Sequence, residues 1–433
     1  MIKLYFKQAW TMMKQNKLFT SIYVAGTGLS IAFTMVLFII YYLKFAPIYP
    51  EYNRNRTLVI SSMAVGKKGE ENWNMCNGGV NPQIKEMFKG LPHLDKIALA
   101  CMDGWEGYTV VLPESKEQIE VSPAWVDAGF WQVFTFRFLS GKPFDETAVE
   151  ADLPVAVLTE SLAKRIFAST DVAGKNFIYN GKELKVAGVV KDANGTTPAT
   201  AAHIYLPFYY GGLTKPNPYT PGLMGISDLY MTATSEADVE TLRNEVLDVL
   251  NRYNQEDKEW EHFYNDQPDT WWKSTFRYGC GPAPDVKGII QSILYMLLAL
   301  LFIPAINLCG LISSRMDERM SELGVRKAYG ATNTGLLTQV LTENLLLTII
   351  GGLVGLTLAY FIAWTGAEWV VNLLDAYVEL GKLDTSFTVE MLFNPTIFLT
   401  VFGLCLLLNV ISALVPTIIA LRHSIIYSIQ TKR

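Results

Sequence analysis

Charged residues are scarce in this sequence, and four long stretches lack them altogether. Only 18% of the 433 residues are Asp, Glu, Lys or Arg, half are hydrophobic, and the mean hydropathy is +0.20. The uncharged stretches separate Lys17 from Lys44, Lys287 from Arg315, Glu343 from Glu368, and Glu390 from Arg422. Because a membrane-spanning helix needs roughly 20 apolar residues, we predict spans at 18–43, 287–313, 335–365 and 395–421.

The uncharged spans also disfavour one class of membrane protein. Proton relays and ion sites inside a membrane depend on ionisable side chains, so a secondary transporter is disfavoured.

Catalytic signatures are missing as well. The four histidines are scattered, no HExxH, GxSxG or CxxC motif occurs, and no Gly-Lys pair is followed by Ser or Thr, as a phosphate-binding loop requires. We therefore expect neither an enzyme nor a chain that binds a metal or cofactor itself.

Basic residues indicate which segments face the cytoplasm. They gather ahead of the first span, in the loop between the second and third spans, and at the C-terminus, whereas the loop between the third and fourth spans is acidic. We therefore expect both termini on the cytoplasmic side of the membrane and residues 44–286 and 366–394 on the outer side. Residues 1–17 alternate lysines with apolar residues, which fits a cytoplasmic amphipathic helix on membrane lipid or a plain extension of the first span. No basic face suggests nucleic acid.

The external segment 44–286 has the pattern of an α+β domain, built either as one body or as two lobes. Strands are expected at 57–63, 109–112, 154–158 and 228–233, and helices at 161–167 and 239–253. Asn180-Gly181 between two alternating segments predicts a hairpin with a type I′ turn. Three cysteines, Cys76, Cys101 and Cys280, fall in this segment, so we expect any disulfide to join two of them, with Cys76 and Cys101 the favoured pair.

Small and polar residues in the spans suggest how the helices pack. Gly351, Gly352 and Gly355 in the third span include a GxxxG pattern, which allows close helix approach either within the chain or between two chains. Asn307 and Asn409 are candidates for hydrogen bonds between helices.

The cytoplasmic loop 314–334 is short, charged and carries an apolar strip at Met320, Leu323 and Ala328. Such a loop suits a short helix pressed against a partner, or else a solvated connector. It contains a particular string: Glu318-Arg319-x-x-Glu322-Leu323-Gly324-Val325-Arg326-Lys327-Ala328-Tyr329-Gly330-Ala331. This string resembles the coupling loop of the MacB and FtsX superfamily of ABC transporter membrane subunits, with Tyr329 in place of the usual leucine.

The resemblance covers much of the chain. Segments 121–127, 139–144, 154–167, 174–175 and 186–192 are similar to the MacB-like periplasmic core, and one span before a large external domain with three after it, followed by a 422–433 cytoplasmic tail, is the family's topology. The resemblance implies ATPase-coupling roles for ten residues: Glu318, Arg319, Glu322, Leu323, Gly324, Val325, Arg326, Lys327, Ala328 and Gly330.

The same resemblance implies how such a chain works. It would carry ATP-driven motion from a separate cytoplasmic ABC ATPase, which holds ATP and magnesium, to its external domain, acting as a dimer with an identical or a different second permease. Export of antimicrobial peptides, macrolide-like compounds or lipoproteins is the expected outcome, with use of a periplasmic adaptor or outer-membrane partner left open. The alternative is an FtsX-like regulator that activates an external cell-wall hydrolase or sensor.

Overall fold

The computed structural model describes most of the chain and divides it into two compact units. The described residues are 10–11, 13–70, 74–102, 107–112, 116–193, 195–212, 214–215, 220–366 and 395–422. One unit comprises residues 1–41, 287–367 and 387–433, and the other comprises 42–286 and 368–386. Most of the predicted N-terminal helix 1–17, the loop 366–394 and the tail 422–433 lie outside the described residues.

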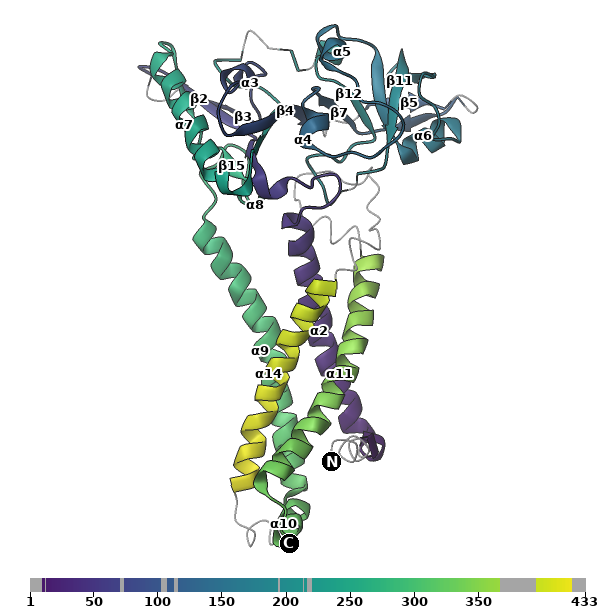
Figure 1. Cartoon of the computed structure of the whole chain (residues 1–433), viewed down its shortest axis with the longest axis vertical. Coiled ribbons are helices and arrows are strands. Elements are labelled where there is room, and N and C mark those ends of the chain that lie inside the picture. The colour runs from purple at the N-terminus through teal and green to yellow at the C-terminus, as the bar shows by residue number, and fades with distance from the viewer. Residues whose placement is uncertain are drawn as a thin grey trace. The chain divides into compact units, whose positions relative to one another are not determined.

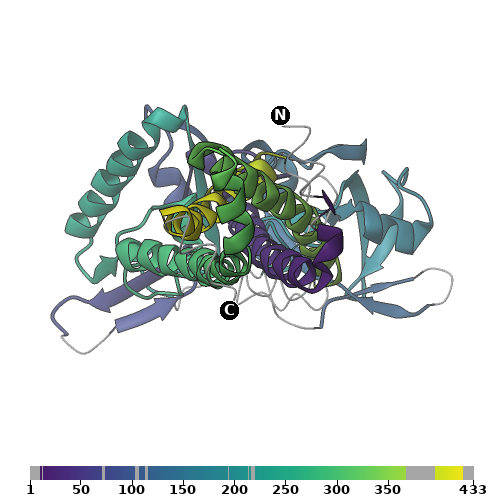
Figure 2. The ribbon, with the colours of Figure 1, turned by 90° about the horizontal axis from the view of Figure 1, so that it is seen from below.

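The first unit consists of long apolar helices, which appear in Figure 1 and end-on in Figure 2. Its helices are α2 (Lys17–Phe45), α9 (Val286–Glu318), the short α10 (Met320–Ala328), α11 (Asn333–Thr365) and α14 (Pro395–Arg422). Within the described residues, three stretches are long and apolar enough to cross a membrane: Lys17–Phe45, Asn333–Thr365 and Phe398–Ile419. In α9 the described apolar stretch covers Val286–Leu300, so the fourth span remains a prediction.

Glycines of α11 let neighbouring helices of the same chain approach closely. A β-carbon on Gly355 would lie 2.6 Å from the carbonyl oxygen of Gly28 in α2, and one on Gly351 would lie 3.0 Å from the Cβ atom of Thr27. Gly352 faces the ring of Phe402 in α14 just as closely. The glycine face of α11 is therefore covered from within the chain, by α2 and α14.

Hydrogen bonds between side chains join three of the helices at one level. The Tyr23 hydroxyl of α2 lies 3.3 Å from Oγ1 of Thr348 in α11, and the Asn409 amide of α14 donates to the same oxygen at 3.4 Å. Polar pairs of this kind hold membrane helices together, because an unpaired polar group in lipid is costly. The side chain of Asn307, the other predicted partner, is not among those described.

The second unit is built on a mixed twelve-stranded sheet. Its path is β15-β1-β13-β4-β7-β12-β9-β11-β10-β5-β6, with β8 paired to β11. The pairs β9–β11 and β7–β12 are parallel and the others antiparallel. The strands are β1 (Thr57–Ile60), β4 (Leu94–Met102), β5 (Thr109–Val111), β6 (Gln118–Glu120), β7 (Pro123–Val126), β8 (Phe138–Gly141), β9 (Val155–Thr159), β10 (Asn176–Tyr179), β11 (Lys182–Val190), β12 (Ile204–Pro207), β13 (Asp228–Ala233) and β15 (Asp269–Thr270).

A smaller sheet and short helices complete this domain. The small sheet has the order β14 (Trp260–Phe263), β2 (Met63–Lys67) and β3 (Asn74–Asn77). The helices are α3 (Ile84–Met87), α4 (Phe130–Val133), α5 (Glu146–Glu150), α6 (Glu160–Phe167), α7 (Val239–Glu256) and α8 (Trp271–Ser274), with 3-10 turns η1 (Arg54–Arg56), η2 (Tyr210–Gly212) and η3 (Glu236–Asp238). The expectation of an extracytoplasmic domain mixing helices and strands thus matches the observed fold.

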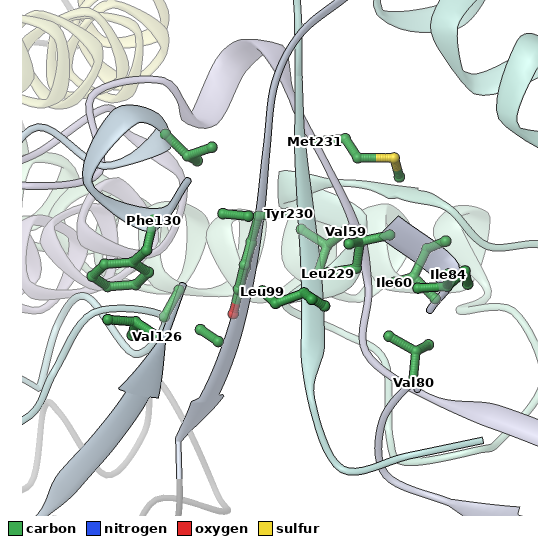
Figure 3. Close-up of a cluster of buried hydrophobic side chains, with 14 of the residues drawn as sticks. Val59, Ile60, Val80, Ile84, Leu99, Val126, Phe130, Leu229, Tyr230 and Met231 are labelled. Atoms are coloured by element: carbon green, nitrogen blue, oxygen red, sulfur yellow. The ribbon is translucent and has the colours of Figure 1, made fainter. Parts of the chain in front are cut away.

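Two clusters of buried apolar side chains form the core of the domain. The larger lies around β1, β4 and β13 and includes Val59, Leu99, Leu229 and Phe130, which Figure 3 shows in close-up. The other lies around β9, β11 and β12 and takes in Leu162 of α6. One continuous sheet passes through both clusters, so the two lobes considered from the sequence share a single sheet.

Local sequence signals located several elements correctly and one incorrectly. The hairpin is confirmed: β10 pairs with β11, and Asn180 and Gly181 have φ angles of 47° and 75°, as a type I′ turn requires. The single strand expected at 57–63 is wrong, because the chain leaves the large sheet after Ile60 and enters the small sheet at Met63. At that break the Ser61 amide donates to Oε1 of Gln267 at 2.9 Å instead of to a strand.

The favoured disulfide is also wrong. Cys76 of β3 is bonded to Cys280, which lies 204 residues further along the chain, and not to Cys101. Cys101 is buried in the smaller core cluster, whereas Cys76 is exposed at the small sheet. The disulfide therefore ties the small sheet to the segment that leads into α9.

Arg54 holds the end of α2 in the domain. Its Nη1 atom donates to the carbonyl oxygens of Leu43 and Ala46, at 2.7 and 2.9 Å, where the helix has run out of backbone partners. The same guanidinium pairs with Glu51 at 2.6 Å, and both side chains are almost fully buried. Glu51 also accepts a hydrogen bond from Thr200 at 2.9 Å.

We predict that Arg54→Met destabilises the domain strongly, because it leaves the Glu51 carboxylate buried and the helix carbonyls unpaired. The expected loss is about 3–5 kcal/mol of unfolding free energy, measured by thermal or denaturant unfolding of the full chain in detergent. Arg56→Met is the control, since Arg56 pairs with Asp95 at a partly exposed site where the expected loss is roughly 1 kcal/mol. Equal losses in the two variants would contradict the role given to Arg54.

Candidate functional site

The ten residues singled out by the coupling string lie on and around α10, at the turn between α9 and α11 (Figure 1). Charges suit a short helix here, with Glu322 in the first turn and Arg326 and Lys327 in the last. Gly330 has a φ of 91° and ends the helical stretch, while Gly324 lies inside α10 and does not interrupt it. Thr332 then caps α11, its Oγ1 atom accepting from the Gly335 amide at 3.2 Å.

One side of α10 packs into its own chain. Met320 and Leu323 are buried in a cluster with Met316 of α9 and with Leu336 and Val340 of α11. These are two of the three residues expected to form a strip pressed against a partner. The third, Ala328, is exposed. The apolar strip therefore belongs largely to the interior of the helix unit.

A buried ion pair joins the start of α10 to α11. Nη1 of Arg319 lies 2.8 Å from Oε2 of Glu343, and only 8% of Arg319 and 3% of Glu343 are exposed. The Gln339 amide adds a hydrogen bond to the other oxygen of Glu343, at 3.3 Å. Glu343, which bounds the uncharged stretch of the third span, thus makes a contact between helices.

A second set of polar contacts holds the last turn of α10. Arg326 donates through Nη1 to Oε1 of Gln339 at 2.8 Å and through Nη2 to Oε1 of Glu322 at 2.5 Å. Gln339 thus links the Arg326 contact to the Arg319–Glu343 pair. A buried charge that loses its partner is costly. These polar contacts therefore fix the orientation of α10 on α11.

The opposite side of α10 is exposed and partly apolar. Val325 is 46% exposed and Tyr329, at the end of the helix, 89% exposed. Glu318, Ala328 and Gly330 are exposed beside them, and Lys327 is half-buried. Tyr329 was not among the ten sequence candidates, although its departure from the usual leucine of the string was the signal that could have added it.

The described residues contain no cluster of three or more His, Cys, Asp or Glu side chains able to hold a metal ion. The two sides of α10 differ in their surroundings. Its inner side is fixed to two long helices by apolar packing and a buried ion pair, and its outer side presents an aromatic ring, an apolar side chain and charges. Such a surface suits a protein contact.

Two family descriptions match consecutive parts of the sequence. The MacB-like periplasmic core domain matches residues 20–249, more than half of the chain, and the FtsX-like permease C-terminal domain matches residues 293–425, which include α10. The chain belongs to the MacB/FtsX family of ABC transporter permeases.

Curated relatives of this permease agree in family. An uncharacterized ABC transporter permease, YknZ of Bacillus subtilis, is 25% identical over 57% of this chain and 58% of its own length. The macrolide export ATP-binding/permease protein MacB of Aggregatibacter actinomycetemcomitans is 27% identical over 53% of this chain and 33% of its own. The MacB protein of Neisseria meningitidis is 26% identical over 61% of this chain and 39% of its own length. The matched part therefore spans less than two thirds of each of these relatives.

Solved structures of related external domains also align with this permease. The extracellular domain of YknZ from Gram-positive bacteria covers 47% of this chain and 99% of its own, with 14% identity and a TM-score of 0.33. The periplasmic region of MacB from Actinobacillus actinomycetemcomitans covers 47% and 88%, with 18% identity and a TM-score of 0.31.

We predict that Glu343→Leu destabilises the helix unit of this permease, because it leaves the Arg319 guanidinium buried without its carboxylate. The expected loss is about 3–5 kcal/mol, measured by unfolding of the detergent-purified chain. The double variant Arg319→Met with Glu343→Leu should recover much of the loss, because it replaces the pair by apolar side chains. A double variant that is less stable than Glu343→Leu would refute the pairing.

Proposed function

We propose that this chain is a subunit that transmits motion from a separate cytoplasmic ATPase to its external domain. Family membership supports a role in an ABC transporter, and the sequence contains no Gly-Lys-Ser/Thr phosphate loop with which to hydrolyse nucleotide itself. ATP and magnesium would then be bound by the partner. The chain would sit in the bacterial inner membrane with four spans, α9 being the second, and with both termini inside.

The attachment of α10 carries this proposal. A partner that contacts Val325 and Tyr329 pushes on a helix whose other side is locked by Arg319 and Glu343. Because Arg319 sits at the junction of α9 and α10 while Glu343 belongs to α11, the force reaches both helices together. Closure of an ATPase dimer on nucleotide would supply the displacement.

The buried and exposed sides of α10 suggest different roles for the ten sequence candidates. Leu323, Gly324 and Arg319 would act from the buried side, as positioning residues, while Glu318, Val325, Ala328 and Gly330 would meet the ATPase. Glu322, Arg326 and Lys327, each half-buried, would lie at the border between these sides.

Assembly and cargo follow from the family by analogy. The permease would work as a dimer with an identical or a different second permease. Export of macrolide-like compounds is supported by the names of its MacB relatives, and antimicrobial peptides and lipoproteins are further candidates. A periplasmic adaptor or outer-membrane partner would be needed only where the cargo crosses a second membrane.

We predict that Val325→Asp combined with Tyr329→Asp abolishes copurification of the ATPase, because two carboxylates replace the exposed apolar contact. The measurement is the amount of ATPase recovered with affinity-tagged permease from native membranes, at equal permease content. Tyr278→Asp is the control, the same change at a tyrosine that is 69% exposed in the external domain. Undiminished ATPase recovery with the double variant would remove the α10 surface from the proposed function.

A further inference from the structure

The external domain contains a cavity of about 250 Å³ beside the end of α2. Residues of β1 and β13, of α8 and the position after it, and of a loop near residue 196 form its walls. Val59 pairs with Tyr230 in the strand register, so the alternation of side chains along the strands places Val59, Tyr230 and Asp228 on one face. The cavity thus lies between a sheet face and α8, and its lining is mostly apolar.

Asp228 is the acidic group of this cavity, and it has little to balance its charge. Among the described residues it forms no ion pair, and its side chain accepts one hydrogen bond, from the Tyr230 hydroxyl at 3.1 Å. Burial raises the pKa of Asp228 to about 7, although the Tyr230 hydrogen bond lowers it. A positively charged ligand would stabilise the ionised form of such a buried carboxyl group.

Trp271 is a second residue of the cavity wall that carries a buried polar group. Its side chain is 6% exposed, and its Nε1 atom has no hydrogen-bond partner among the described residues. A buried indole N–H usually has an acceptor, so this donor could take a ligand oxygen as its partner. The Tyr230 ring lies 6.2 Å from the Trp271 ring, so the two aromatic side chains are neighbours in the cavity wall.

The two basic residues at the cavity are engaged elsewhere. Arg54 pairs with Glu51 and places its guanidinium carbon 5.2 Å from the centre of the Trp271 ring. The Lys44 ammonium lies 4.7 Å from the centre of the Phe276 ring. Asp228 therefore remains the carboxylate that a cationic ligand would meet.

We propose that this cavity binds a small amphipathic organic amine. The ammonium group pairs with Asp228, a carbonyl or ether oxygen accepts the Trp271 N–H, and an apolar body lies against Val59, Met102 and Tyr230. The volume is below the roughly 300–1,000 Å³ of typical ligand sites, which limits the occupant to a small molecule or to one end of a larger one. The assignment does not depend on the proposed role in transport.

Binding of three matched probes to the detergent-purified full chain tests the proposal, measured by saturation-transfer NMR titration. L-leucinamide has the ammonium, the carbonyl and a branched apolar chain, N-acetyl-L-leucinamide lacks the charge, and 3-methylbutylamine lacks the carbonyl. Leucinamide should bind about tenfold or more tightly than the acetylated probe, because a charge-assisted hydrogen bond is lost. It should also bind several-fold more tightly than 3-methylbutylamine.

Two variants assign these preferences to residues. Asp228→Asn should abolish the preference for leucinamide over its acetylated form, and Trp271→Phe should abolish the preference over 3-methylbutylamine. Asp248→Asn, on the exposed side of α7, and Trp272→Phe, next to Trp271 but outside the cavity lining, make the same chemical changes as controls and should alter neither. Thermal unfolding of each variant verifies that it is folded.

The proposal is overturned if leucinamide does not bind, if the acetylated probe binds equally well, or if folded Asp228→Asn keeps the preference for the charged probe. None of these results bears on whether an ATPase docks at α10, so the two proposals succeed or fail separately.

Discussion

The buried pair between Arg319 and Glu343 is the interaction on which the helix unit depends for a defined α10. A nine-residue helix has little stability of its own, so its orientation must come from tertiary contacts. Apolar packing through Met320 and Leu323 supplies attraction, and the ion pair with its Gln339 bridge supplies a single geometry. A sliding α10 would separate Arg319 from Glu343 and leave it the longer 3.6 Å contact with Glu322, and this cost favours a single position of α10 on α11.

A comparable device fixes the chain at the other end of α2. Arg54 binds the last carbonyl groups of that helix and is itself held by Glu51, so the helix end is bonded to the segment just before strand β1. The disulfide between Cys76 and Cys280 ties the segment before α9 to the small sheet in the same way. The end of α2 is thus held in the domain by hydrogen bonds, and the segment before α9 is held by a disulfide. The amine-binding cavity adjoins the Arg54 attachment, where an occupant would bear directly on it.

Sequence patterns predicted what depends on neighbouring residues and missed what depends on distant ones. The Asn180-Gly181 hairpin and α7 follow from turn and helix signals within a few residues. The break after Ile60 could not be predicted, because it depends on Gln267 far along the chain, and neither could the Cys76–Cys280 pair. The coupling string marked the right segment, but which of its residues face inward is decided by α9 and α11. Leu323 is therefore buried and Val325 exposed, although both were assigned one role.

The rigidity of α10 on α11 is the central claim and is tested most directly by distance measurement. Spin labels on cysteines introduced at Val325 and Thr338, both exposed, would report the distance between the two helices by electron paramagnetic resonance, with Cys101, Cys309 and Cys405 replaced by alanine. The account predicts one narrow distance distribution in the otherwise native chain and a broad one when Arg319→Met is added. A broad distribution with Arg319 in place, or an equally narrow one without it, would contradict the claim.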